Sequence, residues 1–186
     1  MKSKKKWRKR VLEDLYRYTG RNDLLTFVKT YLLTPGFRIT FWFRLASAFS
    51  GVLGIISNIM LTHYRYLFGI TLYRNTQIGK GFYIGHFSGI VISPKAKIGN
   101  NCNISQCVTI GASGRGGARG VPEIGNNVYI AAGAVVIGKI KVGNNVVIGA
   151  NAVVTKDVPD NSIVAGVPAK MISTIDGENE YILNKV

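Results

Sequence analysis

The chain has 186 residues, 47% of them hydrophobic, which excludes a wholly disordered protein and supplies enough apolar side chains for a buried core. The formal net charge is +15, and seven of the first ten residues are Lys or Arg, so much of the excess lies at the N-terminal end. The other basic residues are scattered and no nucleic-acid-binding module is recognised, which argues against nucleic acid as a partner.

The N-terminal third has a helical pattern. Apolar residues recur at spacings of three and four over residues 7–32, which predicts a helix that ends at Thr34-Pro35-Gly36. A second helix is predicted over residues 37–49. No charge occurs over residues 45–62, but serine and glycine dilute this stretch, so we expect buried or interfacial helices rather than a membrane span.

Residues 1–66 therefore have two interpretations. Basic residues that flank aromatic, apolar helices suit contact with an anionic membrane face, whereas the same helices could simply pack against the rest of the protein. No secretory signal follows the charged start, and Cys102 and Cys107 have no partners for a disulfide framework or a zinc site. We expect a cytoplasmic protein, with the inner face of the cell membrane as a candidate location.

From residue 72 onward the dominant feature is a repeat of six residues. The aliphatic residues that open the repeats are Leu72, Ile78, Ile84, Ile92, Ile98, Ile104, Ile110, Ile124, Ile130, Val136, Val142, Ile148 and Val154. A small or apolar residue follows four positions later in nearly every repeat. Two inward positions in six, separated by turns rich in Gly and Asn, predict a triangular coil whose stacked turns bury a ladder of Ile and Val.

The repeat is interrupted twice. The step from Ile84 to Ile92 is eight residues, and the step from Ile110 to Ile124 is fourteen, so residues 112–121 are expected to leave the coil as a loop. Next to the first interruption lies His86, one of only two histidines. We interpret His86 as a general base, because an alcohol becomes a good nucleophile when a base of near-neutral pKa takes its proton, and we interpret His63 as structural or interfacial.

Several motifs of residues 78–170 resemble the hexapeptide-repeat acyltransferases, in the branch of the serine acetyltransferases and the polysaccharide O-acetyltransferases. These motifs are Ile78-Gly79-Lys80-Gly81, His86-Phe87-Ser88-Gly89, Gln106-Cys107-Val108-Thr109-Ile110-Gly111 and Gly166-Val167-Pro168-Ala169-Lys170. The resemblance implies a left-handed parallel β-helix, a homotrimer, acetyl-CoA in the groove between neighbouring β-helices, and His86 as the catalytic base.

The resemblance also implies candidate binding residues. Those for the coenzyme are Ala112, Ala132, Gly133 and Ala150, with Lys156 and Lys170 for its phosphates. Apart from the resemblance, the candidates for the acceptor are Gln106 and the loop residues Arg115 and Arg119, whose charge would attract an acidic polymer. Asn103, Gln106 and Ser113 are candidates to stabilise the oxyanion, and no spacing chooses among them. No metal site is predicted.

The chain departs from the serine enzymes at four positions, which in those enzymes carry two Asp, an Arg and a His. Here the matching residues are Gly85, Thr71, Gly120 and Val121, and no Asp or Glu occurs over residues 24–122. A serine ammonium group would thus lack a local counter-charge. This favours a saccharide hydroxyl as the acceptor, with His86 oriented by a backbone carbonyl, a water or Glu123.

The resulting prediction is a mainly β protein: a left-handed parallel β-helix over residues 67–172, with a helical region over residues 1–66 and a tail over residues 173–186. Its predicted function is acetyl-CoA-dependent O-acetylation of a saccharide or polysaccharide precursor. Serine O-acetylation is the alternative reaction, and a non-catalytic trimeric scaffold is the alternative of another class.

Overall fold

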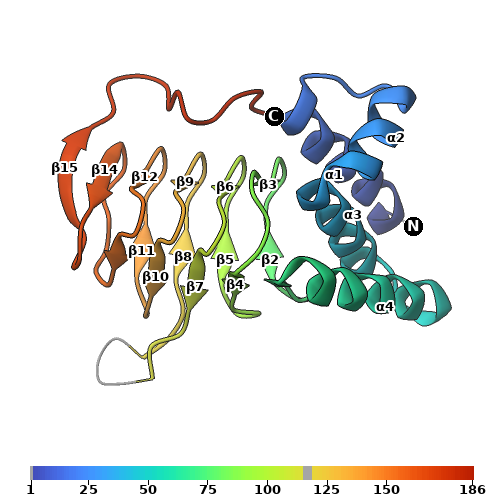
Figure 1. The fold of residues 1–186 in the computed structure, drawn as a ribbon, viewed down its shortest axis with the longest axis horizontal. Coiled ribbons are helices and arrows are strands. Elements are labelled where there is room, and N and C mark those ends of the chain that lie inside the picture. Colours follow the sequence, from blue (N-terminus) through green and yellow to red (C-terminus); the bar gives the residue numbers. More distant parts are fainter. Residues whose placement is uncertain (1, 115–118) are drawn as a thin grey trace.

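The computed structural model describes residues 2–114 and 119–186, and it begins with four helices (Figure 1). They are α1 (Lys2–Thr19), α2 (Leu24–Leu33), α3 (Pro35–Ala48) and α4 (Gly51–Phe68). The single helix predicted over residues 7–32 is wrong. The chain turns at Gly20, where φ is +68°, and the Asp23 carboxylate then accepts a hydrogen bond from the Thr26 N–H and starts a new helix.

The rest of the described chain forms short strands. They are β1 (Ile70–Thr71), β2 (Gln77–Ile78), β3 (Tyr83–Ile84), β4 (Ile90–Ile92), β5 (Lys97–Ile98), β6 (Asn103–Ile104), β7 (Thr109–Gly111), β8 (Glu123–Ile124), β9 (Tyr129–Ile130), β10 (Val135–Ile137), β11 (Lys141–Val142), β12 (Val147–Ile148), β13 (Val153–Val154), β14 (Ser162–Ala165) and β15 (Lys170–Thr174).

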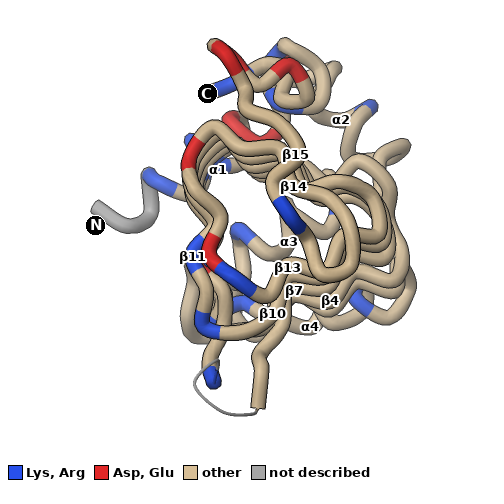
Figure 2. Tube along the Cα trace, turned by 90° about the vertical axis from the view of Figure 1, so that its left-hand side faces the viewer, with Lys and Arg blue, Asp and Glu red and all other residues tan. Residues whose placement is uncertain are grey.

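Every third strand pairs in parallel, which generates three flat sheets around one axis and confirms the predicted left-handed parallel β-helix. Sheet A contains β1, β4, β7, β10 and β13; sheet B contains β2, β5, β8 and β11; sheet C contains β3, β6, β9, β12 and β14, with β15 added antiparallel. Seen along the axis, the coils lie over one another (Figure 2).

The pairing register follows the hexads. Three hexads make one coil, so Val135 pairs with Val153, eighteen residues later. The two interruptions change this number as expected: the pairing of β1 with β4 spans twenty residues and that of β5 with β8 spans twenty-six. In the last coil Val158 bridges to Val142 after only sixteen residues, because the corner before Val158 is two residues shorter.

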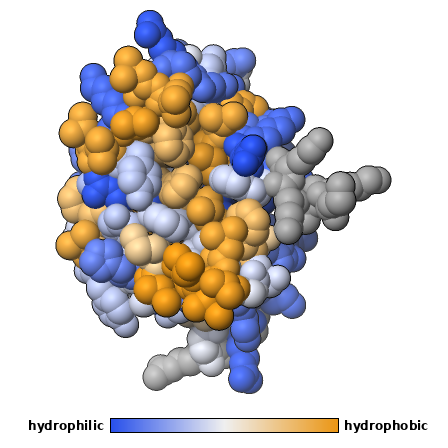
Figure 3. All heavy atoms as spheres, turned by 90° about the vertical axis from the view of Figure 1, so that its right-hand side faces the viewer, coloured by the Kyte–Doolittle hydropathy of each residue, from blue (hydrophilic) through white to orange (hydrophobic). Residues whose placement is uncertain are grey.

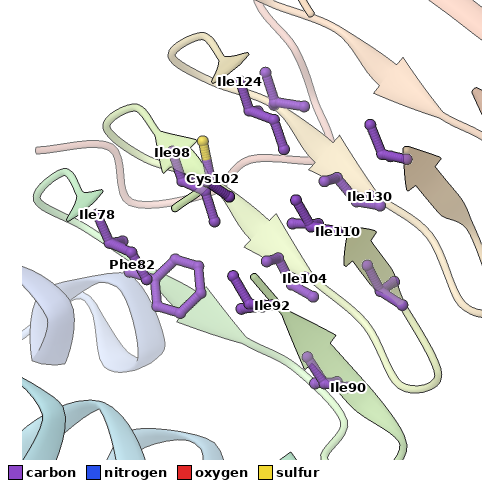
Figure 4. Packing of buried hydrophobic residues seen from close by; sticks show 14 of the residues in the cluster. Ile78, Phe82, Ile90, Ile92, Ile98, Cys102, Ile104, Ile110, Ile124 and Ile130 are labelled. Carbon is purple, nitrogen blue, oxygen red and sulfur yellow. The ribbon is translucent and has the colours of Figure 1, made fainter. Parts of the chain in front are cut away.

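Both inward positions of the hexad are buried, and they form one continuous core (Figure 4). Ile84, Ile104 and Ile130 stack from coil to coil and are at most 1% exposed. Burying such a side chain stabilises the fold by about 1.5–3 kcal/mol. At the corners between sheets B and C, Asn residues adopt the left-handed conformation, and Asn145 donates from its side chain to Asn161 at 2.7 Å.

The helices are joined to this core. Phe43 of α3 and Leu61 and Phe68 of α4 belong to the same hydrophobic cluster as the β-helix. A buried ion pair ties α1 to α3: Arg44 Nε donates to Asp14 at 2.7 Å, while Arg44 Nη1 donates to the carbonyl of Ile78 at 2.9 Å. Burial raises the pKa of Asp14, and the charge of Arg44 acts against this rise. The division at residues 66 and 172 stays a prediction.

The C-terminal tail returns from β15 towards α1 (Figure 1). The Asn103 side chain donates to the carbonyl of Tyr181 at 3.0 Å, and the Val186 N–H donates to the Asn101 side chain at 3.0 Å. Ile182 is 3% exposed. Contacts with successive coils thus hold the tail along the β-helix.

Candidate functional site

Most of the predicted site residues that the structure describes lie at the corners of the coils, on both sides of sheet A. We call the corners that lead from sheet C to sheet A (residues 85–89, 105–108, 131–134 and 149–152) the C–A edge. The corners that follow sheet A and lead to sheet B (residues 72–76, 93–96, 112–122, 138–140 and, in the last coil, 155–157) are the A–B edge.

His86 lies in a two-residue bulge at the C–A edge. The Gly85 N–H donates to the carbonyl of Ile104 at 3.2 Å, and the Cys107 N–H donates to the carbonyl of Ser88 at 3.0 Å. The backbone hydrogen bonds between the two coils are regular before and after the bulge. His86 and Phe87 are therefore the two extra residues of the eight-residue step. Both are exposed, and the Phe87 ring contacts the Phe68 ring of α4, with 5.5 Å between the centroids. The imidazole therefore faces away from the core.

A column of corner residues continues from this bulge along the C–A edge. The ladder hydrogen bonds align Ser88 with Gln106, then with Ala132 and Ala150, in successive coils. The next residue in each corner has positive φ, as at Gly133, where φ is +72°. The Ala134 N–H donates back to the carbonyl of Ala131, which makes this corner a tight β-turn.

This column offers polar backbone groups to a ligand. Within residues 2–114 and 119–186, the N–H groups of Gln106, Ala132 and Ala150 have no hydrogen-bond partner. The Gln106 Oε1 atom is buried and also lacks a partner in this part of the chain. Small side chains let an extended ligand approach the backbone closely, and such N–H groups can then donate to its carbonyl oxygens.

The other predicted residues lie elsewhere. Ala112, Arg119 and Lys156 are exposed at the A–B edge, where Ser113 and Gly120 pair as an antiparallel bridge at the base of the loop. Lys170 is exposed at the start of β15 and pairs with Ala165. Arg115 lies outside the described residues.

A single chain thus separates the predicted coenzyme residues at the corners into two groups on opposite sides of sheet A, and Lys170 belongs to neither group. The repeat in the sequence predicts this division, because equivalent residues one coil (three hexads) apart lie on the same edge, whereas equivalent residues one hexad apart lie on different edges. Counting the hexads in threes would have placed Ala132 and Ala150 with His86, and Ala112 and Lys156 on the other edge.

Of the three oxyanion candidates, only Gln106 lies at the C–A edge. Asn103 is buried and bonded to Arg17 and Tyr181, and Ser113 is at the A–B edge. Glu123 does not orient His86 within one protomer, because it lies on sheet B and accepts from Lys97 at 2.6 Å. This hydrogen bond and the Lys97 charge lower the pKa of Glu123. Among the described residues, no side-chain hydrogen bond to His86 is formed.

Two residues that the sequence pattern did not mark, Tyr18 and Gly36, hold the strand before His86. The Tyr18 hydroxyl accepts from the Ile84 N–H at 2.9 Å and donates to the Ile84 carbonyl at 3.2 Å. Burial raises the pKa of Tyr18, so the hydroxyl stays protonated. Gly36 packs so closely that a Cβ there would lie 2.3 Å from the Ile84 carbonyl oxygen. Helices α1 and α3 thus fix the backbone next to the bulge.

One cavity of the described chain lies away from His86. It has a volume of about 1200 Å³ and runs between α1 and the outer face of sheet B, with Arg10, Lys97 and Glu123 in its lining. Within the parts that the structure describes, no three His, Cys, Asp or Glu side chains lie together as a metal-binding group. We therefore take the C–A edge, with His86 and Gln106, as the candidate site.

Comparisons with known proteins agree with this geometry. Residues 122–156 match the family model "Bacterial transferase hexapeptide (six repeats)". The chain is 36% identical over 154 residues to a serine acetyltransferase of Synechococcus elongatus, covering 82% of this chain but only 62% of that protein. The chain thus spans about three fifths of the length of this curated relative.

Solved structures cover more of the chain. A serine acetyltransferase of Neisseria gonorrhoeae, in complex with serine, is 31% identical with a TM-score of 0.73; the match covers 92% of this chain and 71% of that one. A serine acetyltransferase of Brucella abortus, in complex with coenzyme A, is 28% identical with a TM-score of 0.79, covering 92% and 70%. The match therefore includes helices as well as the β-helix.

Proposed function

Because the chain belongs to the hexapeptide-repeat acyltransferases, in their serine acetyltransferase-like branch, we propose that it transfers an acetyl group from acetyl-CoA to a hydroxyl group. The observation that carries this proposal is the exposed His86, presented by a bulge at the head of a column of small corner residues. The similarity to a structure that binds coenzyme A supports the choice of donor.

In the proposed reaction, His86 takes the proton of the acceptor hydroxyl while the oxygen attacks the thioester carbonyl carbon. The carbon–sulfur bond then breaks, an acetyl ester remains on the acceptor, and the protonated imidazole returns its proton to the leaving sulfur. Gln106 is the side chain of the column best placed to bond a polar group of either substrate, since its Oε1 atom has no partner within the described chain.

The separation of the two edges supports a shared site. A homotrimer would place the A–B edge of one subunit, with Ala112 and Lys156, against the C–A edge of its neighbour, with His86 and Ala150. Coenzyme A would lie in the groove between them, its arm along the corner N–H groups. Lys156 and Lys170 are the proposed partners of its phosphates.

Serine is the acceptor that the comparisons support better, because the relatives are named serine acetyltransferases and one neighbour is solved with serine. A saccharide hydroxyl is the second candidate, and a specific observation favours it. The corners of the C–A edge contain no Asp or Glu, and the described acidic residues lie instead in the helical region, near β11 and in the C-terminal tail (Figure 2). An ammonium group desolvated without a counter-charge would cost several kcal/mol, on the order of a lost buried pair.

Turnover distinguishes these acceptors. The purified full chain is incubated with acetyl-CoA and either serine or neutral and acidic saccharides, and the released thiol is followed. Thiol release that depends on one acceptor and on His86 supports the proposal and names the acceptor class. If coenzyme A does not bind in calorimetry, the protein is a non-catalytic scaffold and the proposal is wrong.

Mixed trimers test the shared site. Ala112→Trp blocks the A–B edge, and His86→Ala removes the base from the C–A edge. If each site combines two subunits, co-expression of the two inactive variants restores part of the activity, because some sites receive both intact edges. If both edges of a site belong to one subunit, each site carries one lesion and no activity returns.

A further inference from the structure

Helices α2 and α4 have their large apolar residues on the outside. The buried residue of α2 is Thr30, and α4 buries Gly54 and Ser57 together with Leu61 and Phe68. The exposed positions carry larger side chains. Those that matter most here are Leu24 (78% exposed), Leu25 (78%) and Leu33 (69%) on α2, and Val52 (75%), Ile55 (61%) and Ile59 (60%) on α4.

The exposed apolar side chains of α4 lie together on one face of the helix. On α4, Val52, Ile55 and Ile59 are spaced by three and four residues, which places them on one side of the helix. Figure 3 shows the helical end of the molecule, where apolar surface gathers in more than one large area. Exposed apolar surface of this kind marks an interaction site rather than an ordinary solvated surface.

Charge identifies the partner. The formal net charge is +15, and seven of the first ten residues are basic. The first turns of α1 lie at the helical end, and Arg8 and Lys9 are exposed there (Figure 1). Lys29 is exposed on α2, and no Asp or Glu occurs within α2, α3 or α4. The same basic face of a second copy would be repelled from this one, whereas an anionic surface would be attracted.

We propose that α2 and α4 form a docking face for the surface of an anionic lipid bilayer. The exposed Leu, Val and Ile side chains enter the boundary between headgroups and acyl chains, while the basic residues contact the lipid phosphates. The helices lie along the membrane: no helix in the described part of the chain combines the length and hydropathy that crossing a bilayer requires. This inference does not depend on the acetyl transfer proposed above.

Vesicle co-sedimentation of the full chain tests the proposal. The probes are phosphatidylcholine vesicles with about 30% phosphatidylglycerol and vesicles of phosphatidylcholine alone, two compositions chosen to separate the charge contribution. We expect preferential binding to the anionic vesicles, weakened by 0.5 M NaCl because salt screens surface charge. The double variant Ile55→Ser and Ile59→Ser should lower the partition coefficient by about tenfold or more.

The matched control is Met171→Ser with Ile172→Ser on β15, at the opposite end of the β-helix, where the side chains are 56% and 66% exposed. This control should bind vesicles like the unchanged protein, and thermal unfolding should show that both variants are folded. Equal binding of the unchanged protein and the α4 variant overturns the proposal. A smaller particle mass of the α4 variant without lipid also overturns it, because the face is then covered by a second copy.

Discussion

The β-helix and the N-terminal helices distribute their apolar side chains in opposite ways. In the β-helix the aliphatic residues of the hexads point inward, and the corners carry small or polar residues. The buried residues of α2 and of the first half of α4 are small or polar, and many Leu, Val and Ile side chains of these helices are exposed; only Leu61 and Phe68, further along α4, join the core. The β-helix thus buries its aliphatic residues between its own coils and the packed helices, whereas α2 and α4 leave many of theirs exposed, on the face that we propose contacts a lipid bilayer.

The proposed reaction and the proposed membrane contact also belong to different regions. The two histidines belong one to each region: His86 lies in the bulge of the β-helix and His63 is exposed on α4. If the reaction takes place at the edge of the β-helix alone, replacing His86 by Ala should reduce turnover, whereas replacing His63 by Ala should not.

The largest expected effect is therefore on turnover. His86→Ala should lower kcat/KM by about 10²- to 10⁴-fold, because the acceptor hydroxyl loses its general base. The side chain is exposed, so thermal stability should not change. His63→Ala is the matched control and should keep the rate within about twofold, an effect below 0.5 kcal/mol. Similar losses in both variants would show that the helices take part in the reaction with soluble acceptors.

The next largest effect should be on stability, at the buried ion pair of Arg44 and Asp14, where the helices contact the β-helix. Arg44→Met leaves the buried Asp14 carboxylate without its partner and should reduce the free energy of unfolding by about 3–5 kcal/mol. Urea unfolding measures this change. In the double variant with Asp14→Asn, part of the stability should return, since the uncompensated charge is gone. A cost below 1 kcal/mol for the single variant would mean that the ion pair does not hold the regions together.

Equivalent isoleucines in the two regions should differ in stability. Ile130→Ala removes a fully buried side chain of the β-helix and should cost about 2–5 kcal/mol. Ile59→Ala, on the exposed face of α4, should stay within about 0.5 kcal/mol of the unchanged protein. Unfolding midpoints at one protein concentration give both values. Equal costs would contradict the inverted burial of α4.

The smallest effect concerns the exposed pair of Lys97 and Glu123 on sheet B. Because the pair lowers the pKa of Glu123, its contribution to stability is present above the unfolded pKa and is lost as the pH falls through the folded pKa. Lys97→Gln should move the pKa of Glu123 up towards its ordinary value and remove this acid-dependent contribution. NMR titration of the Glu123 carboxyl carbon measures the shift. An unchanged titration would show that the pair is not formed in solution.

Much of the β-helix could be predicted because the same six-residue pattern specifies, in every coil, which side chains point into the core. Ile84, Ile104 and Ile130 occupy equivalent positions, and each is buried as the repeat requires. The helical region was harder. The predicted helix over residues 7–32 divides at Gly20, because a glycine with positive φ and an Asp cap override a continuous apolar spacing.

The sequence predicted which residues belong to the candidate site, but it did not predict how they lie relative to one another or which other residues hold them in place. The register break marked His86, and the motifs marked Ala132 and Ala150. Tyr18 gave no signal, because its role depends on a contact with Ile84 across 66 positions of the chain. Long-range contacts of this kind leave no periodicity in the sequence.

By itself, the amino-acid sequence determined the coil: a six-residue period places two side chains inward in every repeat, and burial of those side chains selects one fold. Only the tertiary structure decided which corners share an edge, which strand Tyr18 and Gly36 hold, and which faces of α2 and α4 stay exposed. The physical reason is that periodicity encodes burial between neighbouring repeats, whereas edges and faces arise when separate elements pack against one another.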